Sequence, residues 1–177
     1  VSGDFLTIEV RAEEHSHTLV TTPGAGRVYR ARPDGLIQKQ QVNLSTSCGS
    51  ALEWMPLETI LFPSSKAQLE TRVDLAADSA FIGWEITSLG LPANGVRLND
   101  ADQQTTLKQG LKIYREGRLL LNERLKLTPE NNEVLNASAG FRGQPVHGLM
   151  VAGPFAADLP SSAMETLQAL CDEHIAG

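Results

Sequence analysis

The chain has 177 residues, of which 41% are hydrophobic, and this length suits one domain with a sizeable core rather than two. Its 21 Asp and Glu residues outnumber its 15 Lys and Arg residues, so the net charge of −6 would repel the phosphate backbone of a nucleic acid. The sequence contains neither an apolar run long enough to cross a bilayer nor a signal-type segment. The two cysteines, Cys48 and Cys171, belong to no paired-spacing motif, which is usual in a reducing compartment. We therefore expect a cytoplasmic protein that binds neither nucleic acid nor membranes.

Short runs of alternating apolar and polar residues, separated by Gly, Pro, Asn and Asp, predict that the chain is mainly β. A weak repeat supports this, because residues 8–20 align with residues 42–54 and with residues 73–84, at offsets of 31 to 34. Each unit contains a strand, a turn and a second strand, and stacked units would bury a continuous apolar seam. The predicted fold class is mainly β, with stacked, β-helix-like sheets and one or two short helices.

Acidic residues interrupt the apolar runs of these strands. Burying an ionised carboxylate is unfavourable unless a cation or hydrogen bonds offset the loss of water. For each residue alone, a solvent-facing position on an alternating strand explains the charge. Their recurrence favours a polar interior path or a metal-handling surface. The residues concerned are Glu53, Glu58, Glu85 and Glu123, of which the first and third adjoin a tryptophan.

Later segments carry clear local signals. Leu107–Tyr114 and Leu119–Leu127 flank a short polar segment, which predicts a hairpin whose tight turn uses a positive φ at Gly117. Breakers in residues 89–95 and 136–148 predict loops. Near the end, a capping box followed by apolar residues at helical spacing predicts an amphipathic helix from about Ala163 to His174.

Three other groups of residues have both a functional and a structural explanation. His15 and His17 would share one face of a strand and could bind a metal ion, but a polar turn has the same composition. Cys171 and His174 lie one helical turn apart, yet no further ligand is visible. The glycine-rich segment 22–27 lacks the Lys-Ser/Thr ending of a phosphate loop. The structural explanation is favoured for all three, and without a catalytic motif we expect no enzymatic activity.

Seven segments stand out in order along the chain: Val1–Asp4, Thr21–Ala25, Arg27–Arg30, Leu52–Glu58, Gly83–Ile86, Leu89–Pro92 and Glu123–Leu125. These ordered motifs, from Val1 to about Leu149, resemble those of the urease accessory protein UreD, called UreH in some bacteria. The resemblance implies that residues 1–177 form a single UreD-type domain. Because members of this family extend further at both ends, it also implies that the domain is incomplete at both ends.

The resemblance implies an accessory scaffold for metallocentre assembly, a chaperone with no catalysis of its own. Such a protein is expected to bind the urease apoprotein and UreF, and through UreF the GTPase UreG, which brings nickel. A water-filled passage lined by acidic and polar residues is expected to conduct Ni²⁺, with no permanently bound cofactor. Weak oxygen ligation suits transfer, because several imidazoles or thiolates would retain the ion. The residues expected to line this nickel path are Asp4, Glu58, Glu85 and Glu123.

Two other functions stay open at the level of sequence. A β-rich protein-binding assembly module with no metal role would show the same repeat and the same acidity. An unrecognised hydrolase would need a nucleophile beside a base, and the sequence shows no such recognisable pair. Capture of UreF and urease would separate the scaffold from the first alternative, and a Ser or His variant that abolishes turnover would support the second.

Overall fold

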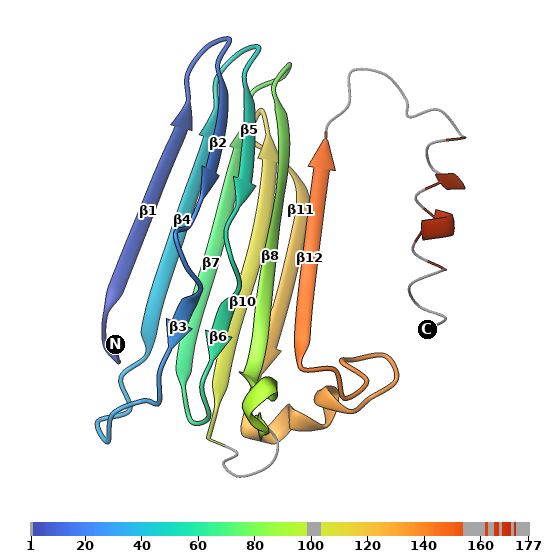
Figure 1. The fold of residues 1–177 in the computed structure, drawn as a ribbon. Coiled ribbons are helices and arrows are strands. Elements are labelled where there is room, and N and C mark those ends of the chain that lie inside the picture. The colour runs from blue at the N-terminus through green and yellow to red at the C-terminus, as the bar shows by residue number, and fades with distance from the viewer. Residues whose placement is uncertain are drawn as a thin grey trace.

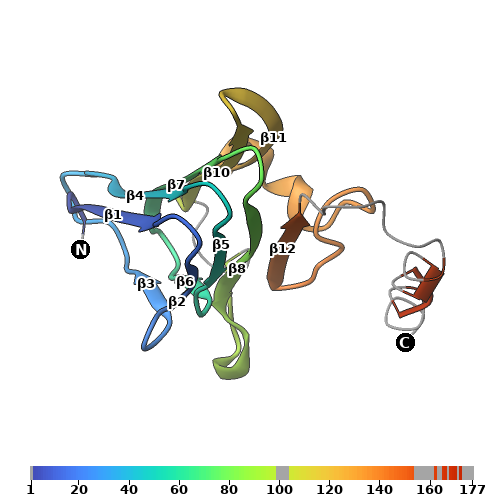
Figure 2. The same ribbon diagram turned by 90° about the horizontal axis from the view of Figure 1, so that it is seen from above.

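The computed structural model describes residues 2–98 and 104–153, together with Ser162, Glu165, Thr166, 168–170 and Asp172. In this part of the chain two sheets face each other, as the end-on view in Figure 2 shows. The prediction of a mainly β fold with stacked sheets is confirmed. The first sheet has the strand order β1 (Phe5–Ala12), β4 (Gln38–Thr46), β7 (Lys66–Leu75), β10 (Thr106–Arg115) and β11 (Arg118–Leu127). The second has the order β2 (His17–Thr21), β5 (Ala51–Met55), β8 (Ala80–Leu91), β6 (Thr59–Leu61) and β3 (Gly26–Val28), with β9 (Val96–Arg97) and β12 (Val146–Gly153) also paired to β8.

Successive coils of the chain place successive strands side by side, as Figure 1 shows. The strands β1, β4, β7 and β10 are parallel neighbours, and so are β2, β5 and β8. Ile8 lies beside Val42, 34 residues later, which confirms the first step of the predicted repeat. Val42 lies beside Thr71, 29 residues later, so the predicted alignment of Val42 with Val73 is wrong by two residues. The same side chains still face inward, because a shift of two residues preserves the face of a strand.

The predicted hairpin is confirmed in β10 and β11. Glu116 and Gly117 form its two-residue turn, with φ values of 50° and 75°. Two positive φ angles give the mirror-image turn that matches the twist of antiparallel strands, and glycine adopts such angles without strain.

The two predicted loops are shorter than expected. The strand β8 continues to Leu91, because Leu89 pairs with Leu61 and Leu91 pairs with Val96. Only residues beyond it form the helical turn η1 (Pro92–Asn94). Similarly, β12 begins at Val146, which pairs with Ser88. Hydrogen bonds from a neighbouring strand thus override the local breakers.

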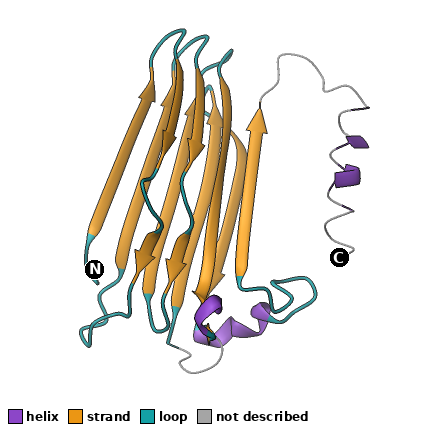
Figure 3. Ribbon diagram, viewed as in Figure 1, coloured by secondary structure: helices purple, strands orange, loops and turns teal. Residues whose placement is uncertain are grey.

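Helical structure is limited to short segments, as Figure 3 shows. Besides η1, the turn η2 (Pro129–Leu135) begins with a capping box at Thr128 and lies at the same end of the sheets. The described residues from Ser162 to Asp172 are helical, in agreement with the predicted helix. The rest of that prediction, including Cys171 and His174, lies outside the described residues. Within the described part, no helix is both long enough and apolar enough to cross a membrane.

The interior between the sheets contains two separate hydrophobic clusters. One surrounds Leu44, Trp54 and Phe81, and the other surrounds Leu61 and Leu107. Leu44, Leu61 and Leu107 are almost completely buried. Because the same strands contribute to both clusters, the interruption between them needs an explanation, and polar side chains provide it.

Candidate metal path between the two sheets

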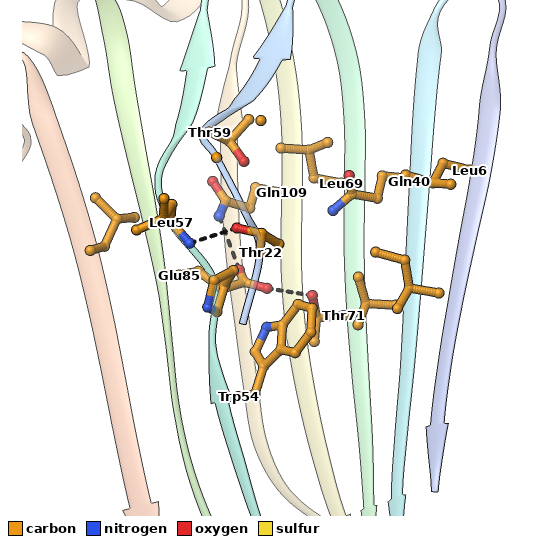
Figure 4. A pocket seen from close by; sticks show the side chains of 16 residues that line it. Leu6, Thr22, Gln40, Trp54, Leu57, Thr59, Leu69, Thr71, Glu85 and Gln109 are labelled. Carbon is orange, nitrogen blue, oxygen red and sulfur yellow. Dashed lines mark hydrogen bonds between the residues drawn. The ribbon is translucent and has the colours of Figure 1, made fainter. Parts of the chain in front are cut away.

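Four polar side chains form a layer between the two hydrophobic clusters, here called the polar layer: Thr71, Glu85, Thr87 and Gln109. The hydroxyl of Thr71 donates a hydrogen bond to Glu85 Oε1. Gln109 Nε2 donates to Glu85 Oε2 at 3.0 Å, and Thr87 Oγ1 donates to Gln109 Oε1 at 3.0 Å. Thr71 and Gln109 belong to the first sheet and Glu85 and Thr87 to the second, so each bond bridges the sheets, as Figure 4 shows for Glu85.

The alternation along β8 directs Glu85 inward. Phe81, Gly83 and Leu89 are buried on the same face, at spacings of two residues. The absence of a side chain at Gly83 makes room beside them, because a Cβ there would lie 2.6 Å from Phe81 Cζ and 3.0 Å from the carbonyl oxygen of Trp54. Glu85 therefore lies two residues after Gly83, a position closely surrounded by the backbone of Trp54 and the ring of Phe81.

Two cavities meet at the polar layer. The first cavity, of about 200 Å³, extends toward β1, β2 and β3, and the second, of about 140 Å³, extends toward β11 and β12. Glu85 and Gln109 line both cavities. The other polar residues are Thr22, Gln40, Thr59 and Thr71 around the first cavity, and Glu123, Arg124 and His147 around the second.

Burial and hydrogen bonding act in opposite directions on the pKa of the Glu85 carboxyl. Burial raises the pKa of the Glu85 carboxyl above its usual value, and the nearby charge of Glu70 adds to the shift. Hydrogen bonds from Thr71 and Gln109 oppose it, because they stabilise the carboxylate. The cavities leave part of the Glu85 surface uncovered by protein atoms, yet the carboxyl lies deep between the sheets. Both of its oxygens accept hydrogen bonds from neutral groups, which a cation could replace.

The structure brings together two of the four acidic residues predicted to line a nickel path. Glu85 and Glu123 both line the second cavity, Glu123 from an exposed position on β11. Asp4 is exposed before β1, where its carbonyl oxygen accepts the backbone N–H of Lys39 at 2.9 Å. Glu58 is half-buried between β5 and β6, and neither it nor Asp4 lines either cavity. Their part in nickel transfer stays a prediction.

Glu53 faces away from the interior, as expected for a solvent-facing residue on an alternating strand. Its Oε1 lies 2.5 Å from His17 Nε2 on the outer face of the second sheet. His15 occupies the preceding turn with φ of 55° rather than the strand, so the two histidines do not share a strand face. Within the described residues, no group of three or more His, Cys, Asp or Glu side chains is arranged to hold a metal ion.

Sequence reasoning missed the uncharged members of the polar layer and His147. Gln109 stands in Leu107-Lys108-Gln109-Gly110-Leu111, next to another polar residue. Nothing in this segment indicates that Gln109 faces the interior. Thr71 replaces the aliphatic residue expected on the inward face of β7, and that departure was a usable signal. The Nδ1 atom of His147 is buried and has no hydrogen-bond partner among the described residues, while its ring packs edge-on against Phe141 at 5.4 Å between centroids. The second cavity thus has an unpaired polar atom beside it.

Comparisons with known proteins place this chain among urease accessory proteins. A profile described as UreD urease accessory protein matches residues 1–177. The urease accessory protein UreD of a Marinomonas species is 43% identical over 98% of this chain, and that of Nitrosococcus oceani is 39% identical over 85%. The alignments cover 56% and 48% of those relatives, so the chain spans about half their length. The chain belongs to the UreD urease accessory protein family.

Proposed function

We propose that the protein is a urease accessory scaffold that assists nickel delivery to the urease active site. In this proposal it binds the urease apoprotein and UreF, which in turn holds UreG. Family membership supports a role in urease maturation, and the partners follow from the resemblance described above. The protein would act in the cytoplasm, as a chaperone for metallocentre assembly, without catalysis and without a permanent cofactor.

One observation supports the nickel role: two cavities meet at Glu85 and Gln109 in the middle of the interior. Their polar lining offers mainly oxygen atoms from carboxylate, amide and hydroxyl groups. Nickel binds imidazole nitrogen and thiolate sulfur more strongly than such oxygens. A passage whose polar atoms are mainly oxygens would therefore release the ion readily. This property suits transfer rather than storage.

A protein-binding assembly module without a metal role is the second candidate. The observation that favours it is a pair of exposed apolar side chains on the outer face of the second sheet, where Leu19 and Met150 are 58% and 60% exposed. Exposed apolar groups on a sheet face often mark contacts with another protein. A scaffold needs such contacts too, so only a test of nickel transfer separates the two functions.

Substitution of Glu85 tests the nickel role. Glu85→Ala and Glu85→Gln should both leave capture of UreF and urease intact while lowering the nickel content of matured urease several-fold, because both remove the anion. Glu53→Gln, on the opposite face of the same sheet, is the matched control and should mature urease normally. Normal nickel content with both Glu85 variants would favour the assembly module.

A further inference from the structure

We propose that the side-chain amide of Gln109 is a rotating switch at the boundary between the two cavities: it donates a hydrogen bond to Glu85 when no cation is present and turns its oxygen toward a cation that enters. The inference rests on the proposed function, since the cation is the Ni²⁺ in transit. It assigns positioning roles to Gln109 and Thr87, two uncharged residues outside the acidic set.

The structure shows the position in which the amide donates to Glu85. Gln109 Nε2 donates to Glu85 Oε2 at 3.0 Å, and its Oε1 accepts from Thr87 at 3.0 Å. Both ends of the amide are therefore held, one by each neighbour. Because Glu85 and Gln109 are the two residues that line both cavities, the bond between them lies across the connection.

Rotation of the amide by half a turn preserves its bond to Thr87. A threonine hydroxyl donates or accepts equally well, so it can accept from Nε2 after having donated to Oε1. Thr87 is 1% exposed and lines neither cavity, so its hydroxyl has little access to water. The terminal torsion of glutamine is broad and has two roughly equivalent states, so the rotation involves little torsional strain. The hydroxyl of Thr87 thus allows two satisfied positions of the same side chain.

The second position is stable only with a cation. After rotation, Gln109 Oε1 faces the carboxylate of Glu85, and two oxygens without a hydrogen between them repel each other. A divalent cation between them reverses this, because both oxygens become ligands. The presence of the ion therefore selects the second position, and its departure restores the hydrogen bond between Gln109 and Glu85.

Variants of Thr87 test the switch in the full-length protein with UreF, UreG and urease apoprotein. Thr87→Val removes the hydroxyl at nearly constant volume and should lower the rate of nickel incorporation into urease about threefold to tenfold, the effect of one lost hydrogen bond. Thr87→Ser keeps the hydroxyl and should stay near wild type. Thr46→Val is the matched control, because Thr46 is a buried threonine that bonds Ser79 away from both cavities.

The outcomes separate the switch from the passage. Normal incorporation with Thr87→Val, alongside impaired incorporation with Glu85→Ala, would overturn the switch and keep the passage. Equal impairment by Thr87→Val and Thr87→Ser would also overturn it, since packing would then explain the loss. Normal incorporation with Glu85→Ala would overturn the proposed path and the switch together.

A direct measurement covers the case in which Thr87→Val fails to fold. The side-chain amide NMR signals of Gln109, identified by their loss in Gln109→Leu, should change chemical shift when diamagnetic Zn²⁺ is added as the probe, because Nε2 then exchanges its bond to the Glu85 carboxylate for one to the Thr87 hydroxyl. The exposed Gln41 on the outer face of the first sheet is the internal control and should not respond. Equal changes in chemical shift at both glutamines, or none at Gln109, would contradict the switch.

Discussion

Two glutamates adjoin a tryptophan, and the fold turns the two pairs in opposite directions. Trp54 is buried in the hydrophobic core while the preceding Glu53 points outward to His17. In the second pair Glu85 points inward to the polar layer, and the preceding Trp84 lies on the outer face. Similar local composition therefore gives one structural carboxylate at the surface and one inside a pair of cavities.

The sheet register explains the reversal. Trp54 lies directly beside Gly83 on the neighbouring strand, so Gly83 faces the same side of the sheet as Trp54. The residues immediately before and after Gly83 face the opposite side. Trp84 consequently faces outward, where its Nε1 donates to the carbonyl oxygen of Pro56 at 2.8 Å. Orientation within the ladder, rather than the identity of a neighbour, decides which glutamate enters the interior.

The largest expected effect is on folding stability at the inward tryptophan. Trp54→Ala should reduce the free energy of unfolding by about 3–5 kcal/mol, because it removes a large side chain that is only 5% exposed. Trp84→Ala should reduce it less, since Trp84 is half-buried on the outer face. Urea denaturation of both variants measures the difference, and equal losses would contradict the opposite orientations.

The close contact between Gly83 and the backbone of Trp54 leaves no room for an added methyl group. Gly83→Ala would bring a Cβ within 3.0 Å of the Trp54 carbonyl oxygen and should reduce stability by about 1–3 kcal/mol through overpacking. Gly95→Ala is unsuitable as a control because φ there is 72°, whereas Gly24 has open space and no positive φ. Gly24→Ala should therefore leave the stability unchanged when thermal melting of both variants is measured.

The inward glutamate should make stability depend on pH. The pKa of Glu85 is raised by burial, so between the usual value of 4.5 and the raised value the unfolded state loses a proton that the folded state keeps. The free energy of unfolding should therefore fall as pH rises through this range. Glu85→Gln cannot titrate and should show a flatter curve. If Glu85→Gln and the wild type showed the same pH dependence of stability, the Glu85 carboxyl would be exposed to water rather than buried.

The smallest expected effect belongs to the outward glutamate. Glu53→Gln should change stability by less than about 1 kcal/mol, because the His17 partner is 66% exposed and exposed ion pairs contribute little. Chemical denaturation of the variant and the wild type at one pH measures the change. A loss larger than that of Gly83→Ala would contradict the assignment of Glu53 to the solvent-facing side.

Sequence patterns predicted the parts of the fold that depend on local chemistry. The hairpin was located correctly because Gly117 supplies a positive φ that few residues adopt. The loop predicted at residues 89–95 was wrong in its first half, since pairing of Leu89 with Leu61 is a contact between distant segments. The polar layer was only partly predicted: Glu85 was identified, while Gln109 resembles a surface residue until its strand is placed.

By itself, the sequence determined that the chain is mainly β and that its strands recur in coils, because alternation with period two is a property of neighbouring residues. It did not determine how far each coil shifts, and only the tertiary structure placed Val42 beside Thr71 and Trp54 beside Gly83. Those shifts depend on the lengths of the connections between coils and on packing across the two sheets. A change of one residue in the register of β8 would have turned Glu85 outward and Trp84 inward.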